Sequence, residues 1–290
     1  MGHLSRAARG GPYDAGRAVG RMNTLVSAWS RGATTLGAWT TLNTPLVAES
    51  LALVGHDYVC VDQQHGISSD SSLVAGLMAV AAGGATSLVR VAANDPSMIG
   101  KALDSGADGV IIPSVNDRGE AERAVQSCTY APHGERSIGP IRTAASGRGP
   151  TPPTPDPPAC IVMVESVSAV SNIDEICAAP GVDAVYIGPA DLALSLGCAP
   201  SLGAAPGVHA EAIAKIVSAC SRHDVISGIH CGSAQQVIEC VKMGIQMVTV
   251  STDSQLLASA AARRLNDVDE GLSSIPGIIR TSARFDRKAV

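Results

Sequence analysis

Six polar residues of this chain follow closely on short apolar runs, which is where catalytic side chains gather in parallel α/β proteins. They are, in chain order, Asp62, Gln64, His65, Arg90, Glu165 and Asp191. Carboxylates, an arginine and a histidine are the side chains that bind divalent metals, stabilise oxyanions and transfer protons. Their combination predicts acid–base chemistry around a bound cation.

The acids Glu165 and Asp191 end two consecutive apolar runs. A carboxylate at such a position is costly without a partner, and two close carboxylates repel each other unless a cation lies between them. Either acid alone could equally pair with an arginine or cap a helix. Both together predict a metal site, and two carboxylates with water and a chelating ligand suit Mg²⁺, Mn²⁺ or Co²⁺ better than zinc.

The basic residues have a structural and a catalytic interpretation. Arg90 could pair with an acid, or it could point a positive charge at an oxygen that becomes negative during a reaction. His65 alone would more often be a buried histidine whose hydrogen bonds are made within the protein. Beside Asp62, and with Asp104 available from the following unit, it is a candidate general base. His230 ends a later apolar run, where we expect it to face the pocket mouth and contact the substrate.

These residues are positioned by an alternation of apolar runs and amphipathic stretches between residues 36 and 252. Many of the stretches begin at Pro or Ser and end in Gly, as helices do. The runs rich in strand-forming residues are LGAWTTL (36–42), YVCVDQQ (58–64), TSLVRVA (86–92), GVIIPSV (109–115), CIVMVES (160–166), AVYIGPA (184–190), ISGIHCG (226–232) and MVTVSTD (247–253).

Eight strand-then-helix units are the number that closes a single-domain (β/α)8 TIM barrel. A doubly wound open sheet would share the alternation, but it needs no eighth strand. It would also favour a glycine-rich G-x-G-x-x-G turn after its first strand, whereas the first run here continues as LGAWTTLNTP. The pattern therefore predicts an α/β barrel, whose carboxyl-terminal rim collects the six polar residues.

The barrel is expected over residues 22–268. Residues 1–21 are rich in arginine and poor in acids, so we interpret them as an extension or a start-site artefact, and residues 269–290 as a polar tail. The connection 130–158 is long for a compact domain, and its proline-rich end, 150–158, favours extended backbone. We expect this connection to border the site.

Composition excludes several classes of protein. Hydrophobic residues make up 46% and charged residues 16%, which indicates a large core rather than disorder. A net charge of −5 gives no basic field for nucleic acid, and no apolar run approaches the ~20 residues that span a membrane. The eight cysteines contain no C-x-x-C pair, so we expect buried free thiols in a reducing cytoplasm.

The chain resembles the HpcH/HpaI aldolases, which are class II pyruvate aldolases such as 4-hydroxy-2-oxo-heptane-1,7-dioate aldolase. The resemblance extends from Met22 to about Val268. The GPADL segment, with an upstream D-x-x-H and V-R-x-x-x-N-D-P, is a specific combination. The segments that carry it are LGAWTTLNTPLVAESLALVGHDYVCVDQQHG, LVRVAANDPSMIGKALDSGADGVIIPSV, YAPHGERSIGPIR, VMVES and YIGPADLALSLG.

The resemblance implies a role for each matching residue. The metal-binding acids of the family match Glu165 and Asp191, and its enolate-stabilising arginine matches Arg90. His65 matches the base, and Asp62 and Asp104 match its supports. The turn whose backbone holds the pyruvate carboxylate matches Gly188, Pro189, Ala190 and Asp191. Trp39 matches a tryptophan on the aldehyde side. Gln64 replaces a glutamate that is frequent in the family, which lowers the negative charge near the metal.

The implied reaction is cleavage of a 4-hydroxy-2-oxo acid to pyruvate and an aldehyde, through a pyruvate enolate stabilised by Mg²⁺, Mn²⁺ or Co²⁺. The implied assembly is a homo-oligomer, a trimer or hexamer, with an exchanged C-terminal helix. No lysine ends an apolar run, since Lys101, Lys215 and Lys242 fall in helical stretches. A Schiff-base route therefore has no candidate, which favours the metal route.

Two alternatives remain open at this point. The first is a lyase of the same superfamily that acts on a CoA thioester, such as malyl-CoA or citramalyl-CoA, and decarboxylation of oxaloacetate could accompany either activity. The second is a barrel that binds a keto acid without turning it over. The base and the arginine argue against the second, because a binding protein needs no base. The segment after Arg142 is shorter than in the family, so the aldehyde partner is the least transferable part.

Overall fold

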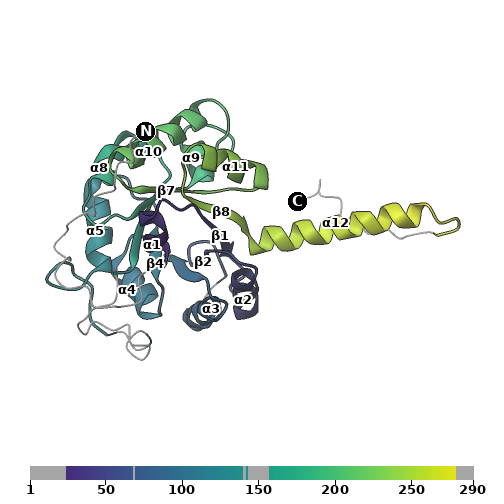
Figure 1. Ribbon diagram of the computed structural model, residues 1–290, viewed down its shortest axis with the longest axis horizontal. Helices are drawn as coiled ribbons and strands as arrows, with labels where there is room; N and C mark the ends of the chain where they lie inside the picture. The colour runs from purple at the N-terminus through teal and green to yellow at the C-terminus, as the bar shows by residue number, and fades with distance from the viewer. Residues whose placement is uncertain (1–23, 68, 140–141, 143–156, 279–290) are drawn as a thin grey trace. The chain divides into compact units, whose positions relative to one another are not determined.

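Eight parallel strands close into one barrel in chain order, as the sequence predicted (Figure 1). The computed structural model describes residues 24–67, 69–139, 142 and 157–278. The extension 1–21, residues 150–156 of the proline-rich run and the last twelve residues of the expected tail, 279–290, lie outside the described residues. The strands are β1 Thr35–Thr40, β2 Tyr58–Asp62, β3 Thr86–Arg90, β4 Gly109–Ile112, β5 Ala159–Val164, β6 Ala184–Ile187, β7 Ile226–His230 and β8 Met247–Thr252.

Every strand ends one to three residues before its predicted run does. The apolar pattern continues past the point where the backbone leaves the ladder, because the first residues of the following loops still pack on the rim. Asp191, for example, lies not on β6 but in the first turn of the helix that follows it. The candidate residues therefore lie either at the last positions of strands, as Asp62 and Arg90 do, or in the turns that follow them, as Asp191 does.

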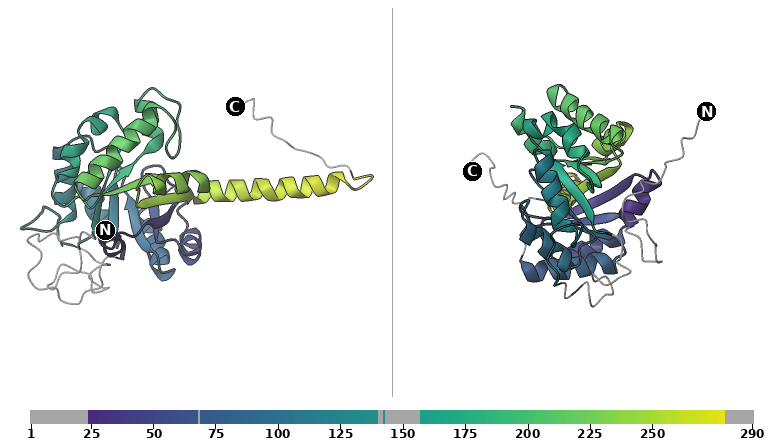
Figure 2. Two further views of the ribbon diagram at one scale, coloured as in Figure 1. Left: turned by 45° about the horizontal axis from the view of Figure 1, so that its top comes forward. Right: turned by 90° about the vertical axis from the view of Figure 1, so that its left-hand side faces the viewer.

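Helices surround the strands, and the two views in Figure 2 show this ring from other sides. Several begin with a side-chain cap, such as Thr44, Asp95 or Asp117, and three have proline in the first turn. The described helices are α1 Thr24–Ser30, α2 Pro45–Leu53, α3 Asp70–Ala82, α4 Pro96–Asp104, α5 Arg118–Cys128, α7 Val167–Ser171, α8 Ile173–Cys177, α9 Pro189–Ser195, α10 Val208–Arg222, α11 Ala234–Lys242 and α12 Asp253–Ser273.

Alternate residues of each strand belong to two different cores. In β5, Ile161 and Met163 pack inside the barrel, whereas Cys160, Val162 and Val164 pack against the surrounding helices. Both faces are buried, which explains why the strands read as nearly continuous apolar runs. The interior is closed at the amino-terminal end of the strands, where α1 contributes Leu25 and Trp29 to the inner core.

The barrel interior also contains a buried polar contact below the catalytic rim. The hydroxyl groups of Tyr58 and Tyr186 each share a hydrogen bond with Oγ1 of Thr249, at 2.9 and 2.6 Å. Burial raises the pKa of both phenols far above the usual value, so they stay neutral. These rings fill the barrel beneath the site and give its floor a fixed shape.

The chain divides into two compact units after Asp253. Helix α12 continues to Ser273, so the expected domain end at 268 falls inside this helix. The polar, glycine-containing sequence from 269 to 273 extends the helix instead of ending it. No helix of the described residues is long and apolar enough to cross a membrane. All eight cysteines lie in the described part of the chain and are free, and seven are buried.

Candidate active site

Eleven of the twelve predicted site residues lie at the carboxyl ends of six strands or on the loops that follow them. Because parallel strands of a closed barrel end on one rim, these loops are neighbours. Trp39 comes from β1, and His230 is the last residue of β7. The others are Asp62, Gln64 and His65 after β2, Arg90 from β3, Glu165 after β5, and Gly188, Pro189, Ala190 and Asp191 after β6.

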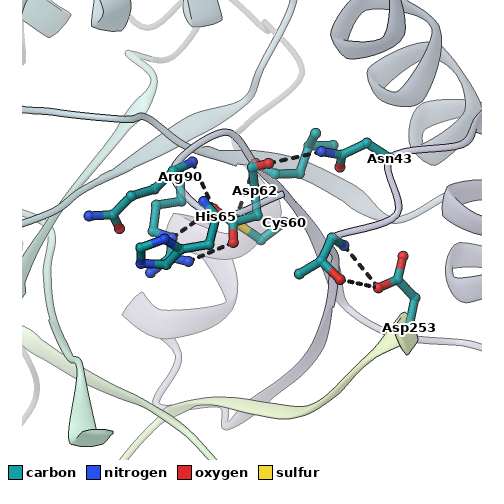
Figure 3. Close-up of polar contacts among 9 residues, drawn as sticks. Asn43, Cys60, Asp62, His65, Arg90 and Asp253 are labelled. Carbon is teal, nitrogen blue, oxygen red and sulfur yellow. Dashed lines mark hydrogen bonds and ion pairs between the residues drawn. The ribbon is translucent and has the colours of Figure 1, made fainter. Parts of the chain in front are cut away.

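Asp62 and Arg90 form a buried, bidentate ion pair at this rim (Figure 3). Nε of Arg90 donates to Oδ1 of Asp62 at 2.9 Å, and Nη2 donates to Oδ2 at 2.6 Å. The guanidinium carbon lies 4.5 Å from the centre of the Trp39 ring, within the range of a cation–π contact. The pair fixes the guanidinium in one plane and uses two of its three nitrogens.

Asp62 holds the turn that carries His65 rather than the imidazole itself. Its Oδ1 accepts hydrogen bonds from the backbone N–H groups of Gln64 and His65, at 3.0 and 3.3 Å. The His65 side chain is exposed, and Figure 3 shows it beside Arg90. The predicted support of His65 by Asp62 thus takes the form of hydrogen bonds to the backbone of this turn.

Asp104 is the one predicted site residue that lies apart from the others. It ends α4, which returns from the carboxyl end of β3 toward the amino-terminal end of β4. Its carboxylate binds Nη2 of Arg136 at 2.7 Å, and the Arg136 side chain is almost fully buried. Within the described part of one chain, no hydrogen bond joins Asp104 to His65. The predicted support of His65 by Asp104 is therefore not formed within a single chain.

Glu165 is oriented by a residue that the sequence analysis missed. Its Oε1 accepts hydrogen bonds from the backbone N–H and the hydroxyl of Ser114, at 2.8 and 3.0 Å. Ser114 follows β4 and has a φ of 57°, a conformation that non-glycine residues rarely adopt. The side chain of Asn116 holds this turn through the Ser114 carbonyl at 2.8 Å. The available signal was two polar residues, Ser114 and Asn116, close behind a strand.

The turn that carries Asp191 lies directly against Glu165. A Cβ on Gly188 would stand 2.5 Å from Oε2 and 2.9 Å from Cβ of Glu165, so a larger residue there would force the Glu165 side chain to shift. The backbone N–H of Gly188 donates to the Val164 carbonyl at 3.1 Å, which ties the turn to the end of β5. Asp191 follows in the first turn of α9 and is exposed.

The electrostatics of this acid pair fit a divalent cation. Burial raises the pKa of Glu165, the charge of Asp191 raises it further, and the Ser114 hydrogen bonds and Arg90 oppose the rise. A cation between the two carboxylates would remove this repulsion. The described residues contain no group of three or more His, Cys, Asp or Glu that could hold a metal. Glu165 and Asp191 would therefore supply two ligands and leave the others to water or substrate oxygens.

An aromatic cluster lies beside Arg90. The ring of Trp39 meets His230 edge to face at 5.3 Å and lies 5.6 Å from Tyr186. Burial lowers the pKa of His230 to about 4, with a further contribution from Arg90, so the imidazole is neutral near pH 7. Nε1 of Trp39 and Oε1 of Gln64 are buried without a hydrogen-bond partner among the described residues. A donor and an acceptor therefore stay available to a ligand.

We predict that His230 makes the protein less stable in acid. Its pKa in the folded protein, about 4, lies below its usual 6.5, so between these values the unfolded chain binds more protons. Unfolding free energy should therefore fall as pH falls from 6.5 to 4, by about 2 kcal/mol at pH 5. Urea unfolding at pH 7 and 5 should show a smaller difference in His230→Phe than in the unaltered protein. The exposed variant His133→Phe is the control, and an unchanged difference in His230→Phe would contradict the assignment.

Comparison with known proteins places the chain in a family. Residues 35–260 match the HpcH/HpaI aldolase/citrate lyase family. A hydroxypyruvate/pyruvate aldolase from Rhizorhabdus wittichii is 36% identical over 247 residues, which are 85% of this chain and 98% of the relative. A 2-keto-3-deoxy-L-rhamnonate aldolase from Escherichia coli is 31% identical over 243 residues, covering 81% of this chain and 89% of the relative.

A solved structure gives the same result for the fold. The crystal structure of an HpcH/HpaI aldolase/citrate lyase family protein from Burkholderia cenocepacia superimposes with a TM-score of 0.80 and 31% sequence identity. The match covers 86% of this chain and all of the other. Since the family match takes in all eight strands and the relatives align over nearly their whole length, the chain belongs to the HpcH/HpaI aldolase/citrate lyase family.

Proposed function

We propose that this protein is a divalent-metal-dependent aldolase that cleaves a 4-hydroxy-2-oxo acid to pyruvate and an aldehyde, or joins them in reverse. The observation that carries the proposal is the meeting of an acid pair and a fixed arginine on one rim. Glu165 is influenced by the charges of both Asp191 and Arg90. The names of the two aldolase relatives support the same class of reaction.

The cation would be held by Glu165 and Asp191, with Mg²⁺ or Mn²⁺ preferred and Co²⁺ as a further possibility, because carboxylate oxygens suit these ions. A bound divalent cation would act as a Lewis acid on the carboxylate and keto oxygens of the 2-oxo acid. Ser114 keeps Glu165 in place through Oε1, which leaves Oε2 on the side of the Gly188 turn.

Arg90 supplies positive charge to the enolate oxygen. Nε and Nη2 are engaged by Asp62, so Nη1 is the nitrogen left to donate to the substrate. A donor fixed before the reaction stabilises developing charge without the cost of reorienting. The ion pair and the Trp39 ring provide that fixation.

His65 is the proposed base. In the cleavage direction it takes the proton of the 4-hydroxyl group. The C3–C4 bond then breaks, its electron pair stays with C3 to form the enolate, and C4 leaves as the aldehyde. Return of a proton to C3 gives the methyl group of pyruvate. The exposed imidazole stands on a turn that Asp62 holds, so it is accessible to the substrate and fixed at its base.

A lyase acting on a CoA thioester would use related enolate chemistry, as would decarboxylation of oxaloacetate. The aldolase relatives, the GPADL segment and the length of the chain favour the aldolase. A barrel that only binds keto acids would need neither a base nor an arginine held beside it. Pyruvate is therefore the first ligand to test.

We predict that the protein exchanges the methyl protons of pyruvate with D₂O when Mg²⁺, Mn²⁺ or Co²⁺ is present, measured by proton NMR. Arg90→Ala should slow this exchange by about 10²–10³-fold, because enolate formation loses its fixed donor. Arg222→Ala, which removes an exposed ion pair with Asp174, is the matched control and should leave the rate unchanged. Absence of exchange with all three metals would refute the proposed function.

We predict that Glu165→Ala and Asp191→Ala each abolish measurable Mn²⁺ binding in isothermal titration calorimetry while circular dichroism stays unchanged. Each substitution removes one of the two protein ligands, and a single carboxylate holds such a cation weakly. Asp174→Ala removes an exposed carboxylate elsewhere and serves as the control. Tight binding in both site variants would mean that the metal lies elsewhere.

We further propose that the protein is a homo-oligomer, a trimer or hexamer, in which α12 packs on a second copy. Its 21 residues are nearly all exposed, including Leu256, Leu257, Leu265 and Val268. In a barrel of this topology a helix covers the seam between β8 and β1. Around that seam the apolar side chains Leu36, Leu53 and Ile238 are exposed. Helix exchange between copies would bury both surfaces.

Sedimentation velocity tests the assembly. The unaltered protein should sediment as a multiple of its 29.4 kDa chain mass. The double variant Leu257→Arg, Leu265→Arg should dissociate, because it places two charges on the apolar side chains of α12. Ser259→Arg adds charge to an exposed polar position of the same helix and is the control. A monomeric unaltered protein would exclude the proposed assembly.

A further inference from the structure

Asp253, directly after β8, holds the loop between β1 and α2 through both oxygens of its buried carboxylate. Oδ1 accepts hydrogen bonds from the backbone N–H and the hydroxyl of Thr41, at 2.9 and 2.8 Å. Oδ2 accepts from the hydroxyl of Thr40 and the backbone N–H of Leu42, at 2.8 and 3.1 Å. Neither the family match nor the proposed mechanism gives this acid a role.

The same loop holds the next one, which connects β2 to α3. The side-chain amide of Asn43 donates to the Asp62 carbonyl at 2.9 Å, and its backbone N–H donates to the Thr40 hydroxyl at 3.2 Å. The backbone N–H of Ile67 donates to the Thr41 carbonyl at 2.8 Å. A Cβ on Gly66 would stand 2.6 Å from the Asn43 amide nitrogen, so the two loops are in close contact.

The second loop contains the catalytic groups of the proposed mechanism. It begins at Asp62, which binds Arg90, and it carries His65 on the turn that Asp62 holds. Figure 3 shows the succession from Asp253 through the loop of Asn43 to Asp62, Arg90 and His65. The chain of hydrogen bonds thus runs across three consecutive loops, after β8, β1 and β2.

We propose that Asp253 is a positioning residue, which fixes the base and the enolate-binding arginine through the β1–α2 loop. This inference rests on the proposed function for its kinetic consequence, but the chain of contacts stands independently of it. The metal-side loops after β4, β5 and β6 are held separately, by Ser114 and Gly188. Loss of Asp253 should therefore impair proton transfer and leave metal binding intact.

Asp253→Asn is the most informative substitution, because it keeps the shape of the side chain and removes one hydrogen-bond acceptor. Each carboxylate oxygen accepts one backbone N–H, from Thr41 or from Leu42. An amide can be rotated either way, and in both orientations its NH₂ group faces one of these donors. Asp253→Glu keeps two acceptor oxygens and should retain more activity. Asn43→Ala breaks the following link without altering Asp253.

Asp108→Asn is the matched control. Oδ2 of Asp108 also accepts a backbone N–H and a hydroxyl, both from Ser87, at 2.9 and 2.7 Å. This contact lies at the amino-terminal end of β3 and β4, away from the catalytic rim. The control therefore measures the general effect of replacing a carboxylate that holds a strand end.

Hydrogen–deuterium exchange with mass spectrometry tests the chain of contacts. In Asp253→Asn and Asn43→Ala, peptides covering 40–43 and 62–67 should exchange faster than in the unaltered protein, because their N–H groups lose protection. Peptides covering 112–116 should be unchanged, as should all three segments in Asp108→Asn. Unchanged protection of 62–67 in both variants would overturn the proposal.

Kinetics on the same full-length variants test the consequence. For metal-dependent proton exchange of pyruvate, kcat should fall by about 10- to 100-fold in Asp253→Asn, with the Kd for Mn²⁺ unchanged. An equal loss of metal affinity would indicate general loosening and would also overturn the proposal. Absence of exchange in the unaltered protein would refute the proposed function instead, and hydrogen exchange would still decide whether Asp253 holds the rim.

Discussion

The buried ion pair between Asp62 and Arg90 is the interaction on which the catalytic rim depends. The two residues face each other in register on β2 and β3, so strand pairing itself aligns them. Buried charges persist only when they are paired, and removing one partner of such a pair costs about 3–5 kcal/mol. The carboxylate also organises the turn at Gln64 and His65. One interaction thus sets the conformation of the arginine and of the loop beside it.

Two separately held groups of loops meet around that pair. The loops after β8, β1 and β2 hold the histidine and the arginine, whereas the loops after β4, β5 and β6 hold the acid pair. The two groups interact through charge, because Arg90 partly offsets the burial and repulsion that raise the pKa of Glu165. Proton transfer and metal binding accordingly have different structural supports within one rim.

Sequence periodicity was sufficient to predict the barrel, because both faces of its strands are buried. The strand-end rule also placed Arg90, Glu165 and His230 on one rim. The supporting residues could not be predicted this way, because their partners are distant in the sequence. Ser114 and Glu165 are 51 residues apart, and Asp253 and Thr41 are 212 residues apart. Such contacts depend on which loops the closed barrel makes neighbours. The ion pair of Asp104 with Arg136 was missed for the same reason.

Asp253 is also the residue at which the two compact units of the chain join, since it is the first residue of α12. In the proposed assembly, Asp253 would both begin the exchanged helix and fix the rim, so subunit association and ligand binding at the rim would be thermodynamically linked. Under such linkage, a ligand that orders the rim strengthens subunit association by the same factor by which association strengthens ligand binding. The C-terminal helix would then be an allosteric element as well as a means of joining subunits.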